Sequence, residues 1–279
     1  MVNLKTFGLV GFPVKHSLSG LMHNAAFKAL GIPAEYKLFE IKPEDLRVFL
    51  AGLDKSNISG LNVTVPYKEK VLDFVKLGQG QDYLKQLGAI NTIVNKGGSW
   101  VGFNTDIPGF ERHLRENLDP KGKSCAILGA GGASRAVVYV LAKAGAREIA
   151  VFDIDKRKTE NVCAMAAALF PGFSISGVNK APDLEIASRD LLVNCTPVGM
   201  KESDPDLIDK DSFHKDLFVY DLIYNPAETK LLKEAGARGC RTANGLGMLL
   251  YQGAVSFKHF TGQDAPVEIM REALTKGVK

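Results

Sequence analysis

The sequence contains few cysteines, and they are scattered along the chain. Cys125, Cys163, Cys195 and Cys240 lie far apart, and no two of them form a Cys-x-x-Cys pair. Zinc sites and disulfide frameworks use cysteines at short, regular spacings, so we expect no metal site and no disulfide scaffold. Three of the four stand in apolar runs, which is typical of small buried side chains in a reducing compartment.

Long apolar runs are also absent. The longest uncharged stretches are residues 161–179, which Pro171-Gly172 interrupts, and residues 242–257, which are shorter than the about 20 residues of a membrane-spanning helix. Residues 1–16 contain Lys5, Pro13 and Lys15 and no continuous apolar core, so we expect no signal peptide. The sequence therefore predicts a cytoplasmic protein with no membrane as a partner.

No block of one charge sign is present either. The net charge is +4, from 35 Lys and Arg against 31 Asp and Glu, and the longest basic run is Lys156-Arg157-Lys158. This balance is too weak to indicate nucleic acid as a partner, although a mild positive charge suits small anionic ligands. We therefore expect a small-molecule ligand.

Apolar and glycine residues, in contrast, are plentiful. Apolar residues make up 46% of the 279 residues, which is enough for packed cores, and the length suggests about two domains. In the first half, residue spacing predicts strands at 6–11, 36–41 and 60–65, helices at 18–30 and 43–53, and a hairpin of 89–94 with 100–103. Beyond residue 121 it predicts strands at 125–128, 149–152, 191–194 and 218–222, helices between them, and a largely helical C-terminus. This alternation implies a parallel sheet covered by helices.

A glycine-rich turn lies directly between the strand at 125–128 and the next helix. Residues 129–134 read Gly-Ala-Gly-Gly-Ala-Ser, so serine takes the third glycine position of a G-x-G-x-x-G motif. The first glycine permits the tight turn, and the second lets the backbone approach a pyrophosphate at the helix N-terminus. Asp153 follows 22 residues after Gly131, at the end of the next strand, where an acidic side chain holds the adenosine ribose. The pattern predicts a dinucleotide site.

Six short polar clusters stand before and after this unit. They are residues 11–19, 62–68, 88–92, 104–106, 221–226 and 244–253. Ser17 and Ser19 at a helix start form a candidate carboxylate site, although either could instead be the helix N-cap. Asn62 and Thr64 point to one side of a strand that Lys68 follows, which suits a polyhydroxylated ligand, although an exposed lysine is the simpler interpretation. Each remaining cluster taken alone is more typical of turns.

Taken together and in this order, the six clusters resemble the shikimate dehydrogenase family over about residues 8–253. The resemblance implies an α/β fold of two domains: an N-terminal α/β substrate-binding domain, and a Rossmann-like domain with a doubly wound parallel sheet. Residues 1–105 and 245–279 would form the first domain, and residues 106–244 the second. The implied reaction is the reversible reduction of 3-dehydroshikimate to shikimate with NAD or NADP and without a metal, in chorismate and aromatic amino acid biosynthesis.

The resemblance also assigns roles to the residues that match the family's motifs. Lys68 and Asp106 would form the catalytic pair. The residues that would bind the substrate are Ser17, Ser19, Asn62, Thr64, Asn91, Tyr224 and Gln252. Those that would hold the dinucleotide are Gly129, Ala130, Gly131, Gly132, Ala133, Asp153, Leu222 and Gly245, the last two at the nicotinamide.

The chemistry of alcohol oxidation favours Lys68 independently. Oxidising a secondary alcohol requires a hydride acceptor and a group that takes the hydroxyl proton. Of the five histidines, His16 and His23 accompany the serines and the others lie outside the polar clusters, so we expect all five to be structural or at the surface. Lys68 is therefore the best candidate for proton transfer, or else a cation that stabilises developing alkoxide charge.

Two segments depart from the family's usual pattern. Ile107-Pro108-Gly109 follows Asp106 where many members have glycine directly, so we expect an altered loop there. Asp153-Ile154-Asp155 stands where the family has Asn-Arg-Thr, whose arginine grips the 2′-phosphate of NADP. We therefore expect NAD to be used at least as well as NADP.

Two other functions remain open at this point. One is an NAD-dependent quinate/shikimate dehydrogenase. The other is a ligand sensor that kept the fold and lost turnover, against which Lys68, Asp106 and the intact glycine-rich turn argue. We expect a monomer or a homodimer in either case.

Overall fold

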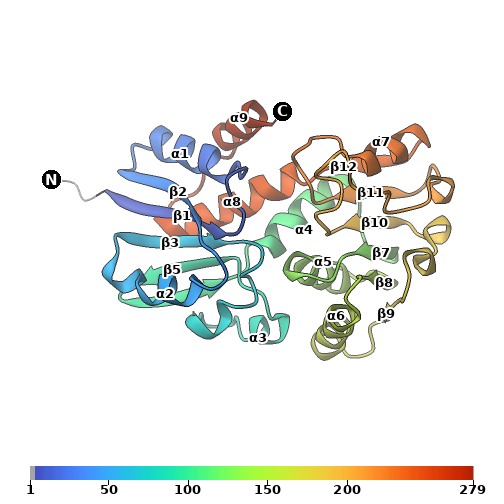
Figure 1. Ribbon diagram of the computed structural model, residues 1–279, viewed down its shortest axis with the longest axis horizontal. Helices are drawn as coiled ribbons and strands as arrows, with labels where there is room; N and C mark the ends of the chain where they lie inside the picture. The colour runs from blue at the N-terminus through green and yellow to red at the C-terminus, as the bar shows by residue number, and fades with distance from the viewer. Residues whose placement is uncertain (1–3, 279) are drawn as a thin grey trace. The chain divides into compact units, whose positions relative to one another are not determined.

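The computed structural model describes residues 4–278, and the chain folds into two compact units (Figure 1). The first unit contains the residues up to Gly109 together with Leu249–Gly277, and the second contains Phe110–Met248. The chain passes from one unit to the other inside two helices, α4 (Asp106–Asn117) and α8 (Leu246–Thr261). No helix among the described residues is long and apolar enough to cross a membrane.

The first unit is built on a mixed six-stranded sheet. Its strands are β1 (Lys5–Gly11), β2 (Ala34–Glu40), β3 (Ile58–Val63), β4 (Lys76–Leu77), β5 (Thr92–Lys96) and β6 (Ser99–Phe103), in the order β2-β1-β3-β5-β6-β4. The pairs β1–β2, β1–β3 and β4–β6 are parallel, and β5 is antiparallel to both β3 and β6. The predicted hairpin is therefore β5 with β6, and it makes the sheet mixed.

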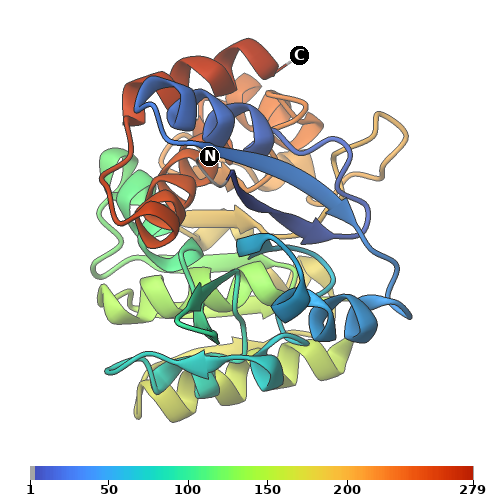
Figure 2. The same cartoon turned by 90° about the vertical axis from the view of Figure 1, so that its left-hand side faces the viewer.

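Helices α1 (Ser19–Ala29), α2 (Leu46–Ala51), α3 (Tyr83–Leu87) and α9 (Val267–Gly277) complete this unit with most of α8. The predicted helix at 43–53 is thus shorter than expected, because α2 begins only at Leu46. Helix α9 packs beside α1, as Figure 2 shows, so the C-terminal segment joins the N-terminal half in one core.

Aromatic rings fill the core of the first unit. Phe7 of β1 stacks on Phe260 of α8 with ring centroids 4.8 Å apart, and Phe27 of α1 lies 5.5 Å from Phe7. His23 stacks on Tyr36 at 4.5 Å and is fully buried, and this burial lowers the pKa of His23 to about 3. His23 is therefore a neutral core residue, as the sequence predicts.

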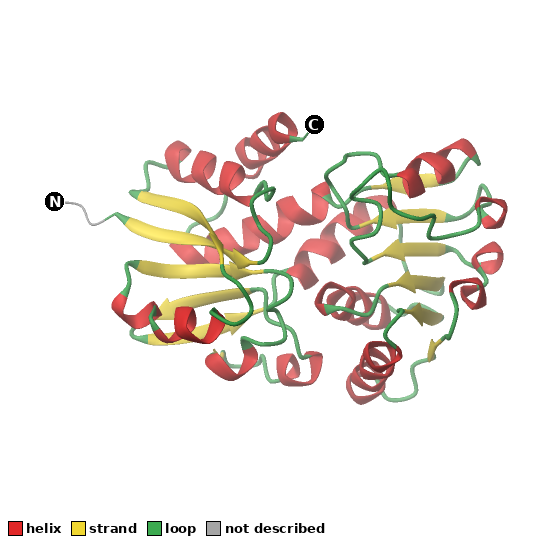
Figure 3. Ribbon diagram, in the orientation of Figure 1, coloured by secondary structure: helices red, strands yellow, loops and turns green. Residues whose placement is uncertain are grey.

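The second unit is built on a fully parallel six-stranded sheet (Figure 3). Its strands are β7 (Ser124–Leu128), β8 (Glu148–Phe152), β9 (Ile175–Gly177), β10 (Leu191–Asn194), β11 (Phe218–Asp221) and β12 (Arg241–Ala243), in the order β12-β11-β10-β7-β8-β9. The chain runs outward from β7 through β8 to β9 and then returns to β10 on the other side of β7. This reversal is the switch point of a doubly wound sheet, outside whose strand ends ligands bind.

Three helices connect the strands of this sheet. They are α5 (Gly132–Lys143), α6 (Lys156–Leu169) and α7 (Lys230–Ala237). Helix α5 follows β7 and helix α6 follows β8, which is the βαβ connection that the sequence predicts.

One expectation is wrong. Residues 107–109 do not form an altered loop, because Asp106 opens helix α4 and Pro108 is its third residue. Proline is tolerated there since the N–H groups of a first helical turn have no partner inside the helix.

Candidate active site

Lys68 and Asp106 form a buried ion pair in the first unit. The Lys68 Nζ atom lies 2.6 Å from Asp106 Oδ2, and the two side chains are 12% and 6% exposed. Lys68 stands in the turn after β3, where its carbonyl accepts a hydrogen bond from Ile90 N at 2.8 Å. The fold thus brings together two residues that are 38 positions apart in the sequence.

Asn91 holds the other oxygen of this carboxylate. Asn91 Nδ2 donates to Asp106 Oδ1 at 2.8 Å and to Thr105 Oγ1 at 3.0 Å, while Asn91 Oδ1 accepts from Thr105 N at 2.6 Å. Both N–H groups of Asn91 are therefore engaged within the protein. Asn91 therefore orients the Asp106 carboxylate beside Lys68.

Asn62 is likewise engaged within the protein. Its Oδ1 accepts from Tyr36 OH at 2.8 Å, and its Nδ2 donates to Thr92 Oγ1 at 2.9 Å and to Ser256 Oγ at 2.8 Å. Asn62 is 5% exposed. Its amide therefore ties β3 to β5 and α8, and the expectation that it reads a substrate hydroxyl has no support from this geometry.

Sequence reasoning missed Ser256 and gave no role to Thr105 of the cluster 104–106, and these two residues join the segments around the ion pair. Ser256 Oγ lies 3.0 Å from Thr105 Oγ1 and 3.1 Å from Thr92 Oγ1, and it donates to Gln252 O at 2.9 Å. Both residues are fully or almost fully buried. Ser256 stands four positions after Gln252 on α8, and this helical spacing was the available signal that it shares a face with a predicted site residue.

Among the remaining predicted substrate residues of the first unit, Gln252 also bonds within the protein: its Nε2 donates to Leu249 O at 2.9 Å, and its Oε1 accepts from Thr105 Oγ1 at 3.4 Å. Ser17 Oγ and Ser19 Oγ are 3.2 Å apart at the start of α1, and Ser19 N donates to Ser17 Oγ at 3.3 Å. The N-cap of α1 is Leu18, so neither serine is the cap residue that the alternative interpretation required. Thr64 is partly exposed just after β3, and Gln252 is 8% exposed.

The glycine-rich turn of the second unit fits a pyrophosphate. Gly131 is the N-cap of α5, and no described side chain caps the first-turn N–H groups of that helix. A Cβ added to Gly131 would meet no atom within 4 Å, so the space beside these N–H groups is open. Gly129 adopts φ +90°, and a Cβ there would lie 2.9 Å from Thr196 Cγ2. Glycine is therefore required at 129 by both conformation and packing.

The Asp153 carboxylate accepts hydrogen bonds from the backbone, which the sequence did not reveal. Its Oδ2 accepts a hydrogen bond from Ala130 N at 2.7 Å, and its Oδ1 accepts from Asp155 N at 2.9 Å. The carboxylate therefore braces the glycine-rich turn. Ile154 beside it is 95% exposed.

Leu222 and Gly245 are in close contact at the carboxyl end of β11. A Cβ added to Gly245 would lie 1.9 Å from Leu222 O, and Gly245 N donates to Ile223 O at 3.0 Å. Tyr224 stands in the same turn, so it belongs to the second unit, whereas Ser17 and Ser19 belong to the first.

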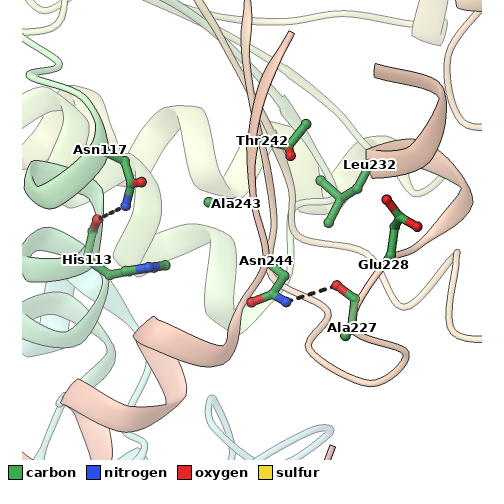
Figure 4. Close-up of a pocket in the computed structure, with 8 residues that line it drawn as sticks. All are labelled: His113, Asn117, Ala227, Glu228, Leu232, Thr242, Ala243 and Asn244. Atoms are coloured by element: carbon green, nitrogen blue, oxygen red, sulfur yellow. Dashed lines mark hydrogen bonds between the residues drawn. The ribbon is translucent and has the colours of Figure 1, made fainter. Parts of the chain in front are cut away.

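A pocket of about 370 Å³ opens near Gly245 (Figure 4). It is lined by His113, Asn117, Ala227, Glu228, Leu232, Thr242, Ala243 and Asn244. His113 Nδ1 lies 2.6 Å from Tyr220 OH, and Asn244 Nδ2 donates to Ala227 O at 2.9 Å. None of the predicted site residues lines this pocket. Within residues 4–278, no group of three or more His, Cys, Asp or Glu side chains is arranged to hold a metal ion.

Comparison with known proteins gives one family. Residues 9–93 match the substrate-binding domain of shikimate dehydrogenase, and residues 245–275 match the C-terminal domain of shikimate 5′-dehydrogenase. Shikimate dehydrogenase (NADP(+)) of Methanopyrus kandleri is 43% identical, across 98% of this chain and 95% of that relative.

Solved structures agree with the sequence relatives. Shikimate dehydrogenase of Aquifex aeolicus superposes with a TM-score of 0.88 at 38% identity, covering 98% of each chain. Quinate dehydrogenase of Corynebacterium glutamicum in complex with NAD superposes with a TM-score of 0.88 at 34% identity, covering 98% of this chain and 100% of the other. This chain therefore belongs to the shikimate dehydrogenase family of NAD(P)-dependent oxidoreductases.

Proposed function

We propose that this protein catalyses the reversible reduction of 3-dehydroshikimate to shikimate with a nicotinamide dinucleotide, in the synthesis of chorismate and aromatic amino acids. The observation that carries the proposal is the buried contact of 2.6 Å between Lys68 and Asp106. It places a mobile proton beside a fixed carboxylate in the unit whose residues 9–93 match a substrate-binding domain. A ligand sensor without turnover would not require such a proton-transfer pair.

Substrate binding in this proposal begins with the two serines at the start of α1. Ser17 and Ser19 receive the substrate carboxylate through their hydroxyls at the N-terminus of α1, whose dipole favours an anion. Thr64 and Gln252 contact ring hydroxyls, and the assignment of Tyr224 to the substrate rests on the resemblance alone. Asn62 and Asn91 support the site indirectly, because their amides already donate hydrogen bonds to Thr92, Ser256 and Asp106.

Lys68 handles the proton. In the direction of reduction, its ammonium group donates a proton to the oxygen of the new alcohol, and Asp106 fixes the position of Nζ. In the direction of oxidation, the neutral amine takes the hydroxyl proton. The bound nicotinamide ring supplies the hydride chemistry. The alternative role, a cation that stabilises alkoxide charge, uses the same geometry.

Residues 129–133 hold the pyrophosphate at the start of α5, and Asp153 holds the adenosine ribose. Asp153 and Ala130 are hydrogen-bonded to each other, so the ribose and pyrophosphate sites are built as one piece. Leu222 and Gly245 line the nicotinamide.

We predict that NAD is used at least as well as NADP. A 2′-phosphate beside Asp153 would place like charges in contact, with Asp155 close by, and exposed Ile154 offers no positive charge where the family has arginine. Lys156 and Arg157 at the start of α6 are the basic groups that could offset this repulsion. The test is kcat/KM at 340 nm for shikimate and quinate with each dinucleotide.

Asp153→Asn is the matched variant for this prediction. The amide oxygen can accept from Ala130 N, so this contact to the glycine-rich turn is kept while the charge and the hydrogen bond from Asp155 N are lost. NADP should gain relative to NAD by about tenfold, the equivalent of about 1.4 kcal/mol. A wild-type preference of tenfold or more for NADP would refute the NAD assignment and give the phosphate to Lys156 or Arg157.

The same assay separates the second candidate function. The resemblance to an NAD-bound quinate dehydrogenase supports quinate as a further substrate. A kcat/KM for quinate with NAD that equals or exceeds the value for shikimate would establish a quinate/shikimate dehydrogenase. Absence of turnover with every combination, together with normal ligand binding, would establish the sensor.

Removal of the serine hydroxyls should weaken substrate binding. In Ser17→Ala and Ser19→Ala, each lost hydrogen bond to a charged carboxylate is worth roughly 1.5–3 kcal/mol, so KM should rise by about 10- to 100-fold with a smaller change in kcat. Calorimetric titration with shikimate measures the effect directly, and Ser99→Ala at the β5–β6 turn is the control. Normal binding by both variants would show that the pair only shapes the start of α1.

A further inference from the structure

Asp221, the last residue of β11, carries a buried carboxylate without a neighbouring cation. It is 0% exposed and forms no ion pair with any described residue. Its partners are neutral: Oδ1 accepts from Asn194 Nδ2 and from Ile223 N, each at 3.0 Å, and Oδ2 accepts from Thr229 Oγ1 at 2.7 Å. The three donors face the charge from β10, from the turn after β11, and from the start of α7.

This charge is costly for the fold. Burial raises the pKa of Asp221 to about 6, although the hydrogen bonds from Thr229, Ile223 and Asn194 lower it. At neutral pH the group is therefore charged in surroundings that disfavour the charge. A neutral amide of the same shape would avoid this cost. The retained carboxylate points to a use for the negative charge itself.

The position of Asp221 in the second unit suggests that use. Asp221 pairs with Asn194 in the sheet, and Asn194 pairs with Leu128, the residue before the glycine-rich turn. These three residues end their strands at the edge where a doubly wound sheet binds its ligand. The next residue, Leu222, packs against Gly245, and the proposed function places the nicotinamide at these two residues.

We propose that the Asp221 carboxylate makes the protein bind the oxidised, positively charged nicotinamide ring more tightly than a neutral residue at this position would allow. The inference rests on the proposed function. The oxidised and reduced dinucleotides share every phosphate and ribose and differ by the charge and shape of one ring. A fixed negative charge beside that ring in a medium of low dielectric therefore favours the oxidised form selectively.

A purely structural role for Asp221 predicts a different result. Asn194 also accepts from Thr196 N at 3.0 Å and donates to Val198 O at 3.2 Å, so Asp221 and Asn194 together hold the segments after β10 and β11. If this were all, loss of the charge would weaken both forms of the cofactor equally. The ratio of the two affinities therefore distinguishes an electrostatic role of Asp221 from a purely structural one.

The experiment compares wild type with Asp221→Asn. Dissociation constants for the oxidised and the reduced dinucleotide, NAD or NADP as the kinetic assay selects, are measured by calorimetry and by nicotinamide fluorescence without substrate. We expect the ratio Kd(reduced)/Kd(oxidised) to fall about tenfold in the variant, because the charge that favours the oxidised ring is removed. An unchanged ratio would overturn the proposal.

Asp204→Asn is the matched control. Asp204 lies in the segment after β10 and accepts from Gly199 N at 2.8 Å and Lys201 N at 3.0 Å, but it is partly exposed. Water and salt screen an exposed charge, so its removal should leave the ratio unchanged. An equal fall in this variant would mean that any charge on the unit acts, and would also overturn the role of Asp221.

A second measurement covers the case in which Asp221→Asn does not fold. In the otherwise wild-type protein, the ratio should fall as pH drops from about 7.5 to about 5.5, because the raised pKa means that the carboxyl becomes protonated in this range. The phosphates are the same in the oxidised and the reduced dinucleotide, so their titration does not change the ratio of the two dissociation constants. A ratio independent of pH would contradict the proposal.

The neighbouring ionisable groups must be separated from Asp221 in this measurement. The segments packed against it carry Cys195, Tyr220, Glu228, Lys230 and Arg241. Tyr220 stays neutral because burial raises its pKa, Lys230 is paired with Asp206, and Arg241 lies over the Phe218 ring. His113 Nδ1 lies 2.6 Å from Tyr220 OH, so the measurement is made in His113→Gln, which removes the imidazole. If wild type binds neither form, the proposed function fails; if it binds both and the ratio does not move, only this inference fails.

Discussion

Lys68→Ala should lower kcat by about 10²- to 10⁴-fold, the range for loss of a positioned acid–base group, with a smaller change in KM for shikimate. The reason is the geometry of the pair: Lys68 Nζ lies 2.6 Å from Asp106 Oδ2, and its side chain is only 12% exposed. Water cannot take the same place with the same orientation. Steady-state kinetics in both directions measure the effect.

Stability must be followed in the same variant. Without Lys68, the buried Asp106 carboxylate keeps the hydrogen bond from Asn91 but loses its charged partner, which is destabilising. The thermal midpoint with and without shikimate therefore accompanies the kinetics. Lys70→Ala is the control, since Lys70 is an exposed lysine two residues away whose ammonium lies over the Tyr67 ring at 5.9 Å. A Lys68→Ala enzyme with near wild-type kcat would exclude Lys68 from proton transfer.

Gly245→Ala should weaken binding of the dinucleotide while leaving shikimate binding intact. The new Cβ would lie 1.9 Å from Leu222 O and 2.5 Å from Leu222 C, which are backbone atoms and cannot swing aside as a side chain does. Either the turn after β11 or the start of α8 must shift. Overpacking of this kind costs about 1–3 kcal/mol or more, so dinucleotide affinity should fall by about 10- to 100-fold.

Gly236→Ala is the matched control for this substitution. Gly236 lies in α7 of the same unit, and a Cβ there meets no atom within 4 Å, so the variant should be neutral or slightly more stable. Calorimetry with the dinucleotide and with shikimate, measured separately, distinguishes local damage from global unfolding. Normal dinucleotide affinity in Gly245→Ala would show that the Leu222–Gly245 contact does not shape the cofactor site.

The sequence determined the parts of this protein that depend on neighbours in the chain. Short apolar runs predicted the strands β7, β8, β10 and β11 close to their observed bounds. The glycine-rich turn was readable because the strand, the turn and the helix are consecutive, and because Gly129 needs the φ of +90° that only glycine adopts easily. The order of the polar clusters was enough to identify the family.

Only the tertiary structure decided how the polar side chains divide their work. Asn62 and Asn91 are predicted to bind the substrate, and the fold in addition gives them protein partners in Tyr36, Thr92 and Asp106 that their sequence positions do not show. Sequence spacing shows which side of a strand a residue takes, but not which distant donor or acceptor will meet it. Ser256 is 194 residues from Asn62, and no local pattern records that contact.

The sequence likewise did not show the surroundings of individual carboxylates. The sequence shows that Asp153 and Asp221 both end strands of one sheet, and the difference between them is three-dimensional. Asp153 remains partly exposed and braces Ala130, whereas β10, the following turn and α7 enclose Asp221 completely. Because the energy of a charge depends on the water and dipoles around it, residue identity was fixed by the sequence, while the chemical character of each carboxylate was decided only by the packed fold.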